Sequence, residues 1–331
     1  DADLLYFVDD DFKERFATTP TRLKNPKFFK PFELLLRMYG IPAYNEFDPT
    51  IFVAISYAFI FGVMFGDVGQ GLFLVVGGFL LYKFKKMDLA AVVSFAGVFS
   101  TIFGFLFGSI FGFENVIDAL WLHPMKHMTQ IPLIGNLNTV FIVTIAFGMG
   151  LTLLTMIFHI INGIKAKDME SIFFDANGVA GLVFYGALVL CIVLYMTGNP
   201  LPATIVLVVM FVIPLIMIAF KEPIMAAIEK KAEIFPKEKG MFFVQTFFEL
   251  FEIMLSYFSN TLSFVRIGAF AVSHAAMMEV VLMLAGAENG GSPNWLVVVL
   301  GNLFVCGMEG LIVGIQVLRL EYYELFSRFY K

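Results

Sequence analysis

The chain has 331 residues, of which 59% are hydrophobic and 15% charged, with a formal net charge of −5 and a mean hydropathy of +0.85. Soluble domains are about 45–50% apolar and about 25% charged, and surface-to-volume scaling allows no water-soluble core that could bury this much apolar surface. The sequence therefore predicts a polytopic protein surrounded by membrane lipid. With 22 Lys and Arg residues and no basic patch to neutralise phosphates, it is not a nucleic-acid-binding protein.

The first 48 residues differ in composition from the rest of the chain. They are polar, rich in Pro, Lys and Arg, and contain no short apolar run with a cleavage site, so they are not a signal peptide. We expect residues 1–48 to be the cytoplasmic end of an upstream N-terminal domain that is missing from this chain, together with the segment leading into the membrane. Residues 49–331 are then the membrane domain.

Apolar runs predict where the chain crosses the bilayer, since a spanning helix takes about 20 residues. The last two runs exceed the thickness of a bilayer, so we expect them to be long and strongly tilted. A Gly-rich turn separates the first two, and we predict that Asp67 in this turn is a structural capping residue. The predicted fold is all-α, with about eight transmembrane helices at residues 50–66, 68–83, 89–111, 138–163, 176–197, 201–220, 243–286 and 294–325.

The distribution of basic residues predicts the orientation, because cytoplasmic loops carry an excess of Lys and Arg. If the N-terminus is cytoplasmic, 19 of the 22 basic residues lie on the inner side, and the outer loops contribute only Lys126. The remaining two, Arg266 and Arg319, lie within apolar spans. Both termini are therefore predicted to be cytoplasmic. Residues 221–242 form a cytoplasmic loop with a helix and a turn, and residues 112–137 form an outer loop.

Potential metal ligands are few. Cys191 and Cys306 both lie in apolar runs and support neither a disulfide framework nor a metal site. His123 and His127 are four residues apart but have no clear third ligand. We interpret them, with Trp121, as part of an interfacial loop, and predict neither a metal nor a cofactor.

The two intramembrane arginines are the strongest functional signal. Arg in hydrocarbon is costly and cannot lose its proton, so it must face a partner or a watery cavity. The apolar run that contains Arg266 continues for more than ten residues after it. Arg266 is therefore too far from the helix end for its side chain to snorkel to the membrane surface. For Arg319 snorkelling stays open, because Glu321 and Glu324 suggest that the helix leaves the membrane nearby.

Polar residues gather on the same helical face as these arginines. At about 100° per residue, a stripe about 100° wide holds Arg266 together with other polar side chains of the seventh span: Glu252, Ser256, Ser259, Ser263, Ser273 and His274. The eighth span repeats the pattern with Asn302, Glu309, Gln316, Arg319 and Tyr323. Antiparallel packing can place both arginines at similar depth. Polar residues interrupted by a fixed positive charge predict two half-paths for an ion and not one open pore.

These residues resemble the membrane domain of rotary V/A-type ATPases, the family of subunit I in bacteria and archaea and of subunit a in eukaryotic vacuolar enzymes. The resemblance covers essentially the whole chain, and eight crossings agree with it. Its motifs are Leu262-Ser263-Phe264-Val265-Arg266 with Ser273-His274, Met308-Glu309-Gly310, Leu318-Arg319-Leu320-Glu321, the turn Gly66-Asp67-Val68-Gly69 and the segments Lys30–Glu33, Met38–Pro42 and Asn45–Thr50.

The resemblance implies a stator whose two long helices lie against a rotor ring of proteolipid subunits. Arg266 and Arg319 would face the ring carboxylates and favour their ionised form. The half-channels it implies are an outer one with His274, Glu309 and Gln316, and an inner one with Glu252, Ser256, Ser259 and Ser263. Gln316 departs from the His of eukaryotic relatives, so proton transfer there would pass to water or to Tyr323. The missing N-terminal domain would contact the peripheral stalks, and a prokaryotic plasma membrane is the expected location, with H⁺ and Na⁺ both open.

Two other classes of membrane protein are alternatives. A secondary transporter could use an intramembrane Arg to bind an anionic substrate, but the halves of the chain show no inverted repeat. A purely structural scaffold leaves the polar stripe unexplained. No GxxxxGK[ST] phosphate loop occurs, so the chain has no nucleotide site of its own and is expected to be a non-catalytic subunit.

Overall fold

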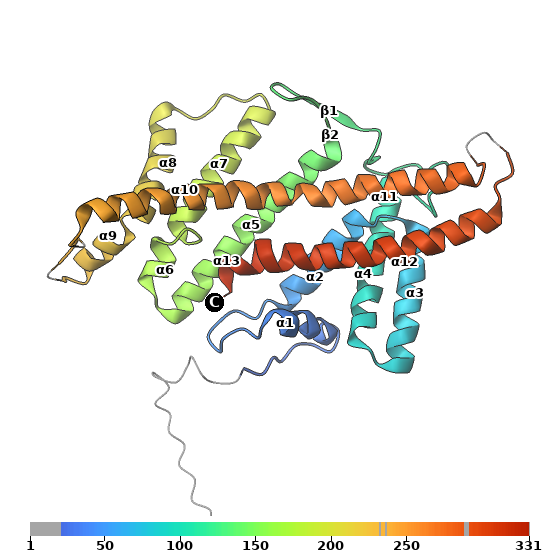
Figure 1. Cartoon of the computed structure of the whole chain (residues 1–331), viewed down its shortest axis with the longest axis horizontal. Coiled ribbons are helices and arrows are strands. Elements are labelled where there is room, and N and C mark those ends of the chain that lie inside the picture. Colours follow the sequence, from blue (N-terminus) through green and yellow to red (C-terminus); the bar gives the residue numbers. More distant parts are fainter. Residues whose placement is uncertain (1–20, 232, 236, 288–290, 331) are drawn as a thin grey trace, which may run out of the picture.

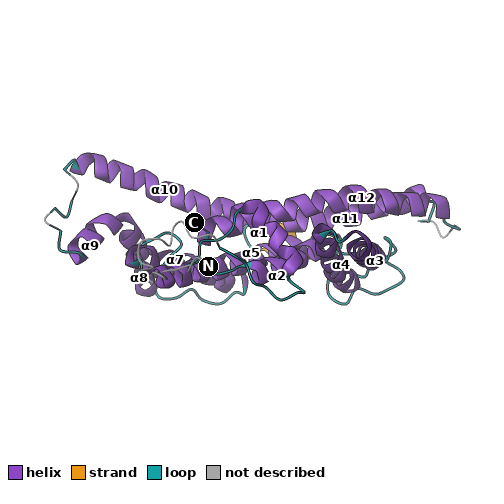
Figure 2. Ribbon diagram, turned by 90° about the horizontal axis from the view of Figure 1, so that it is seen from below, coloured by secondary structure: helices purple, strands orange, loops and turns teal. Residues whose placement is uncertain are grey.

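The computed structural model describes residues 21–231, 233–235, 237–287 and 291–330, and its main helices form two layers (Figures 1 and 2). One layer, here called the long-helix layer, consists of α10 (Lys239–Ser263), α11 (Val265–Leu284) and α12 (Trp295–Arg319). Figure 1 shows these helices running obliquely across the others. The second layer contains α1 (Glu33–Tyr39), α2 (Thr50–Met64), α3 (Val68–Lys85), α4 (Asp88–Phe107), α5 (Thr139–Ala166), α7 (Val179–Met196) and α8 (Thr204–Ala219).

Short elements connect or extend these helices. They are a 3₁₀ turn (Lys30–Phe32), the strands β1 (Met128–Ile131) and β2 (Gly135–Asn138), α6 (Met169–Phe173), α9 (Lys221–Ile228), a π-helical segment (Leu320–Phe326) and α13 (Ser327–Phe329). The antiparallel hairpin β1–β2 lies in the predicted outer loop, where no strand was expected. The helix predicted in loop 221–242 is α9, although α10 begins earlier than predicted, at Lys239.

The structure confirms an all-α membrane protein and has a helix at each of the eight predicted positions. Two of the eight are not simple spans. α2 has only 15 residues, and α8 joins α9 at a bend of 74°. Within the described residues, six helices are long and apolar enough to cross a membrane: Val68–Lys85, Asp88–Phe107, Thr139–Ala166, Val179–Met196, Lys239–Leu284 and Trp295–Phe329.

The short helix α2 lies in the core of the protein. Most of its side chains are buried, and it packs against α4, α11 and α12. Gly62 allows the closest approach, because a Cβ there would lie 2.7 Å from the backbone carbon of Phe99. On the opposite side the Tyr57 hydroxyl donates a hydrogen bond to Gly314 O at 3.3 Å. α2 therefore ties the second layer to the middle of the long-helix layer.

A break at Phe264 divides the seventh predicted span into α10 and α11. The Phe264 N–H donates to Thr261 O at 3.3 Å and the Ile267 N–H donates to Phe264 O at 3.1 Å, so the chain tightens locally to i→i−3 bonds. The Phe264 ring is fully buried against Gly148 of α5, where any Cβ would collide with it. Packing against α5 thus fixes the break, and Arg266 follows it directly.

Asp67 is a structural residue, as predicted. Its side chain is fully buried and caps α3 by accepting the Gln70 N–H at 3.0 Å. It also accepts hydrogen bonds from the Ser109 hydroxyl at 2.8 Å and from the N–H groups of Phe111 and Gly112, each at 3.0 Å. One carboxylate therefore joins the start of α3 to the beginning of the outer loop.

We expect Asp67→Ala to destabilise the fold by about 3 kcal/mol or more, because it leaves several buried donors without an acceptor. Ser109→Ala removes one of these bonds and should cost only about 1 kcal/mol. The midpoint of thermal unfolding in detergent can be followed by thiol labelling of the buried Cys306 in a Cys191→Ser background. Equal midpoints for the two variants would contradict a central role of the Asp67 carboxylate.

Candidate functional site

Arg266 lies in the first turn of α11, directly after the break. Its side chain is half-buried, and Nη1 is buried without a hydrogen-bond partner among the described residues. A guanidinium cannot discharge, so this unpaired donor keeps a full positive charge in the membrane-spanning region.

Glu324 brings the two arginines into one cluster. The carboxyl group lies near Ser263 and interacts electrostatically with both Arg266 and Arg319, without a direct ion pair to either in the described structure. It is buried, and its Oε2 has no hydrogen-bond partner in the described part of the chain. Arg319 itself, the last residue of α12, is exposed. Glu324 is therefore a carboxyl group of the described residues that interacts electrostatically with both arginines.

The π-helical segment explains why Glu324 was missed. The sequence suggested that Glu321 and Glu324 mark a helix leaving the membrane, but both are buried inside the protein. The wider π turn after Arg319 changes the helical phase and turns both carboxyl groups inward. Glu321 is fully buried near Ser56 of α2, and neither of its carboxyl oxygens has a hydrogen-bond partner among the described residues.

His274 and Glu309 form a buried pair between α11 and α12. Nδ1 of His274 lies 2.8 Å from Oε2 of Glu309, and both side chains are only 4% exposed. The other polar atoms of the pair, Nε2 of His274 and Oε1 of Glu309, are buried without partners in the described structure. The Phe65 ring packs on the imidazole with centroids 4.7 Å apart. The pair therefore joins the two long helices through one buried polar contact and leaves two buried polar atoms unpaired in the described structure.

A small cavity connects this pair to the outer loop. It has a volume of about 20 Å³ and is lined by His274, Ser109 and Glu114, among others. That is room for about one water molecule. Glu114 is partly exposed and forms an ion pair with Lys126 at 2.5 Å. Polar groups therefore extend from His274 into the loop of residues 112–137.

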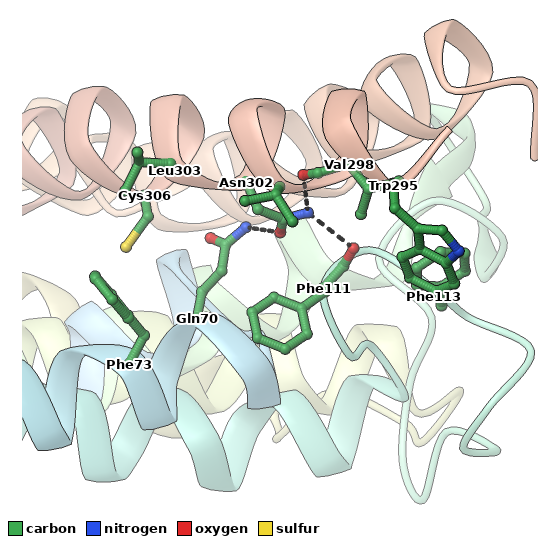
Figure 3. A pocket seen from close by; sticks show the side chains of 10 residues that line it. Gln70, Phe73, Phe111, Phe113, Trp295, Val298, Asn302, Leu303 and Cys306 are labelled. Atoms are coloured by element: carbon green, nitrogen blue, oxygen red, sulfur yellow. Dashed lines mark hydrogen bonds between the residues drawn. The ribbon is translucent and has the colours of Figure 1, made fainter. Parts of the chain in front are cut away.

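A larger cavity beside the N-terminal part of α12 has different walls (Figure 3). Its volume is about 380 Å³, and its walls are mainly aromatic and aliphatic, with Phe73 and Trp295 among them. At its back, Nε2 of Gln70 donates to Asn302 Oδ1 at 2.8 Å and lies 3.1 Å from the Met278 sulfur. Gln70 links α3 to the long-helix layer and was not predicted. Apolar walls suit hydrocarbon and not an ion.

The remaining predicted site residues separate into different surroundings. Ser263 belongs to the Glu324 cluster, and Gln316 is half-buried. On the side of the long-helix layer that the shorter helices leave uncovered, here called the exposed face, lie the exposed side chains of Glu252, Ser256, Ser259, Ile315, Arg319 and Tyr323. The predicted stripe is therefore not continuous, because the break at Phe264 changes the helical phase between Glu252 and His274.

The sequence comparisons agree with this architecture. Residues 8–117 match the model of the V-type ATPase 116kDa subunit family. The A-type ATP synthase subunit I of Aeropyrum pernix is 28% identical over 95% of this chain and 50% of its own length. The protein of that name from Pyrococcus abyssi is 28% identical over 98% of this chain and 47% of its own length. Over nearly its whole length the chain is thus similar to subunit I of A-type ATP synthases.

The match to this family is stronger in one part of the chain. The A-type ATP synthase subunit I of Archaeoglobus fulgidus is 42% identical to this chain over 97 residues, which are 28% of the chain and 14% of that relative. The chain spans about half the length of the curated relatives that it matches most extensively. The helices long and apolar enough to cross a membrane, together with this similarity, support a multi-pass membrane protein.

Proposed function

We propose that the chain is the stator subunit in the membrane sector of a rotary V/A-type ATPase and carries protons or sodium ions past a rotor ring. One observation carries the proposal. The arginine cluster of Arg266, Arg319 and Glu324 lies between a buried polar pair on one side and exposed polar residues on the other. A fixed charge at this place separates two half-paths, as coupled transport requires.

The outer half-path would end at His274 and Glu309. A proton arriving through the small cavity beside Glu114 reaches a pair with one unpaired nitrogen and one unpaired oxygen. From there it passes to a carboxylate of the ring, which becomes neutral and can turn into lipid at low cost. Gln316 does not change charge and serves at most to hold water beside this route.

The arginines would enforce release on the inner side. A nearby guanidinium favours the ionised form of a carboxyl group, so a ring carboxyl group that approaches Arg266 gives up its proton. Glu252, Ser256 and Ser259 on the exposed face, with Ser263, offer the next polar partners. Glu324 provides the countercharge for the arginines between successive ring carboxylates. This mechanism gives the chain two partners, the ring and, through an N-terminal domain, the peripheral stalks.

The orientation is part of the proposal and can be tested by cysteine labelling. Asn136 of β2 and Lys237 before α10 are both exposed, so cysteines at these positions are similarly accessible on their own sides. With both termini cytoplasmic, an impermeant thiol reagent should label Asn136→Cys from outside and Lys237→Cys only after the membrane is opened. The reverse pattern would overturn the orientation.

Co-purification tests the assignment as a whole. An affinity-tagged full-length subunit should bring down a small, very apolar protein of two or four helices that forms a ring. A free-standing secondary transporter would purify without one. That alternative is also weakened by Glu324, because a carboxyl group beside the arginines would compete with an anionic substrate.

A further inference from the structure

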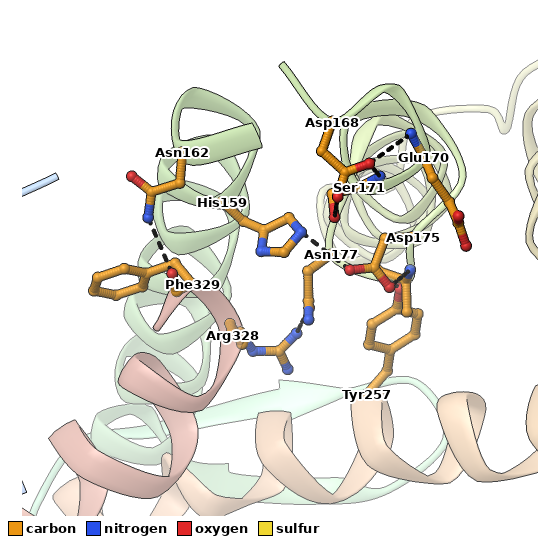
Figure 4. Close-up of polar contacts among 11 residues, drawn as sticks. His159, Asn162, Asp168, Glu170, Ser171, Asp175, Asn177, Tyr257, Arg328 and Phe329 are labelled. Atoms are coloured by element: carbon orange, nitrogen blue, oxygen red, sulfur yellow. Dashed lines mark hydrogen bonds and ion pairs between the residues drawn. The ribbon is translucent and has the colours of Figure 1, made fainter. Parts of the chain in front are cut away.

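A second cluster of buried polar groups lies where α5, α10 and α13 meet, on the covered side of α10 (Figure 4). His159 of α5 forms an ion pair with Asp175, with Nε2 and Oδ2 3.0 Å apart. The His159 side chain is 9% exposed and that of Asp175 is 38% exposed. Burial would raise the pKa of Asp175, but the hydrogen bond and charge of His159 hold it below its usual range. This pair leads from the surface into the protein.

Arg328 of α13 is buried beside this pair (Figure 4). Its Nε donates to Glu324 O at 3.2 Å and its Nη1 donates to Asn177 Oδ1 at 3.2 Å. The guanidinium carbon lies 5.7 Å from the centre of the Tyr257 ring. Nη2 has no hydrogen-bond partner, and no carboxylate lies within 4.0 Å of the guanidinium in the described structure. All its contacts are neutral, so its positive charge is not neutralised by direct contact.

The position of Arg328 lies between two sets of titratable groups. Toward the surface lie His159 and Asp175. One helical turn back along the chain lies Glu324, which neighbours Arg266 and Arg319. Without a cation between them, these groups and intervening water would form a proton route behind α10. Such a route would join the inner surface to the arginine cluster without passing the rotor ring.

We propose that Arg328 closes this route and so prevents a proton leak between the two layers. The inference rests on the proposed function, because a leak past the ring matters only in a rotary stator. A fixed guanidinium charge repels a hydronium ion at short range, most strongly where the surroundings are poor in water. Asn177 and Tyr257 hold the guanidinium in place without neutralising it, so its charge stays at this point of the route.

The test uses the whole rotary complex in liposomes, with the ring carboxylates replaced so that ions cannot pass by rotation. The decay of an imposed pH gradient then reports any other route. Arg328→Met removes the charge but keeps an unbranched apolar chain, and we expect it to speed the decay about tenfold or more. Arg328→Lys keeps a positive charge only while its ammonium stays protonated, so it should leak less than Arg328→Met but more than the parent. Subunit content on gels verifies that each complex is assembled.

Two further variants keep the proposal testable if Arg328→Met does not assemble. Asn177→Asp retains Arg328 and its packing but places a carboxylate at Nη1, and it should also increase the leak. Adding His159→Leu to a leaking variant should restore the parent rate, because it removes the group that carries protons to the surface. An assembled Arg328→Met or Asn177→Asp complex as tight as the parent would overturn the proposal, as would equal leaks in the Met and Lys variants. Absence of a ring from the purified complex would instead refute the proposed function.

Discussion

Replacing Arg266 with Ala is expected to abolish coupled ion transport while the complex still assembles. The side chain is half-buried, and its Nη1 makes no hydrogen bond within the described structure, so little packing depends on it. A nearby cation shifts carboxyl ionisation by about 1–3 pKa units, so its loss should slow proton release from the ring by about 10- to 1,000-fold. The assay is ATP-driven ion uptake into vesicles, with subunit content determined by immunoblot.

Two comparison variants make the Arg266 result specific. Arg266→Lys should also be badly impaired, because an ammonium lacks the planar array of donors and loses its proton more readily when buried. Arg319→Ala should be milder, since Arg319 is exposed at the end of α12. Normal uptake by a fully assembled Arg266→Ala complex would contradict the mechanism, and the transporter and scaffold alternatives would then have to be reconsidered.

Glu309→Gln is expected to slow ion flux by about tenfold or more without preventing assembly, as is usual when a general acid–base group is lost. Gln can still bond to Nδ1 of His274, so the 2.8 Å contact between α11 and α12 can persist while its titratable carboxyl group is lost. Transport is measured over a range of pH. The matched control is Glu249→Gln, which breaks a partly exposed ion pair with Lys221 and should have little effect.

The outcome at Glu309 separates a transport role from a structural one. If Glu309 serves only as the hydrogen-bond partner of His274, the Gln variant should transport normally at every pH, and Glu309→Leu should lower thermal stability. If the pair carries protons, the Gln variant should show a reduced rate with unchanged stability. Unchanged transport across the pH range would remove Glu309 from the outer half-path.

The sequence predicts the helices well because each span leaves a long apolar signal. It also identifies Arg266, His274 and Glu309, since charged and polar residues are rare in such runs. The sequence predicts less well how these residues lie relative to one another, because a stripe drawn at 100° per residue assumes an unbroken helix. The turn at Phe264 depends on how its ring fits against Gly148 of α5, a contact between residues more than a hundred positions apart.

The carboxyl groups after Arg319 show a second limit. Near a helix end, Glu is ordinarily a sign of the membrane surface, yet Glu321 and Glu324 are buried. Their orientation depends on the π-helical turn Leu320–Phe326, which no periodic pattern in the sequence predicts. Arg328 was counted among the cytoplasmic basic residues for the same reason. Its burial becomes apparent only when α13 is packed against α5 and the Arg328 side chain lies over the Tyr257 ring of α10.

The most direct measurement is cross-linking between the exposed face of the long-helix layer and the rotor ring. In a background with Cys191 and Cys306 replaced, Ile315→Cys places a thiol one turn from Arg319 on the exposed side of α12. Paired with a cysteine beside the ring carboxylate, it should form a disulfide that stops ATP-driven transport until it is reduced. The equally exposed Val76→Cys on α3 should form none. No cross-link at Ile315, or an equal one at Val76, would contradict the assignment of this chain as the stator.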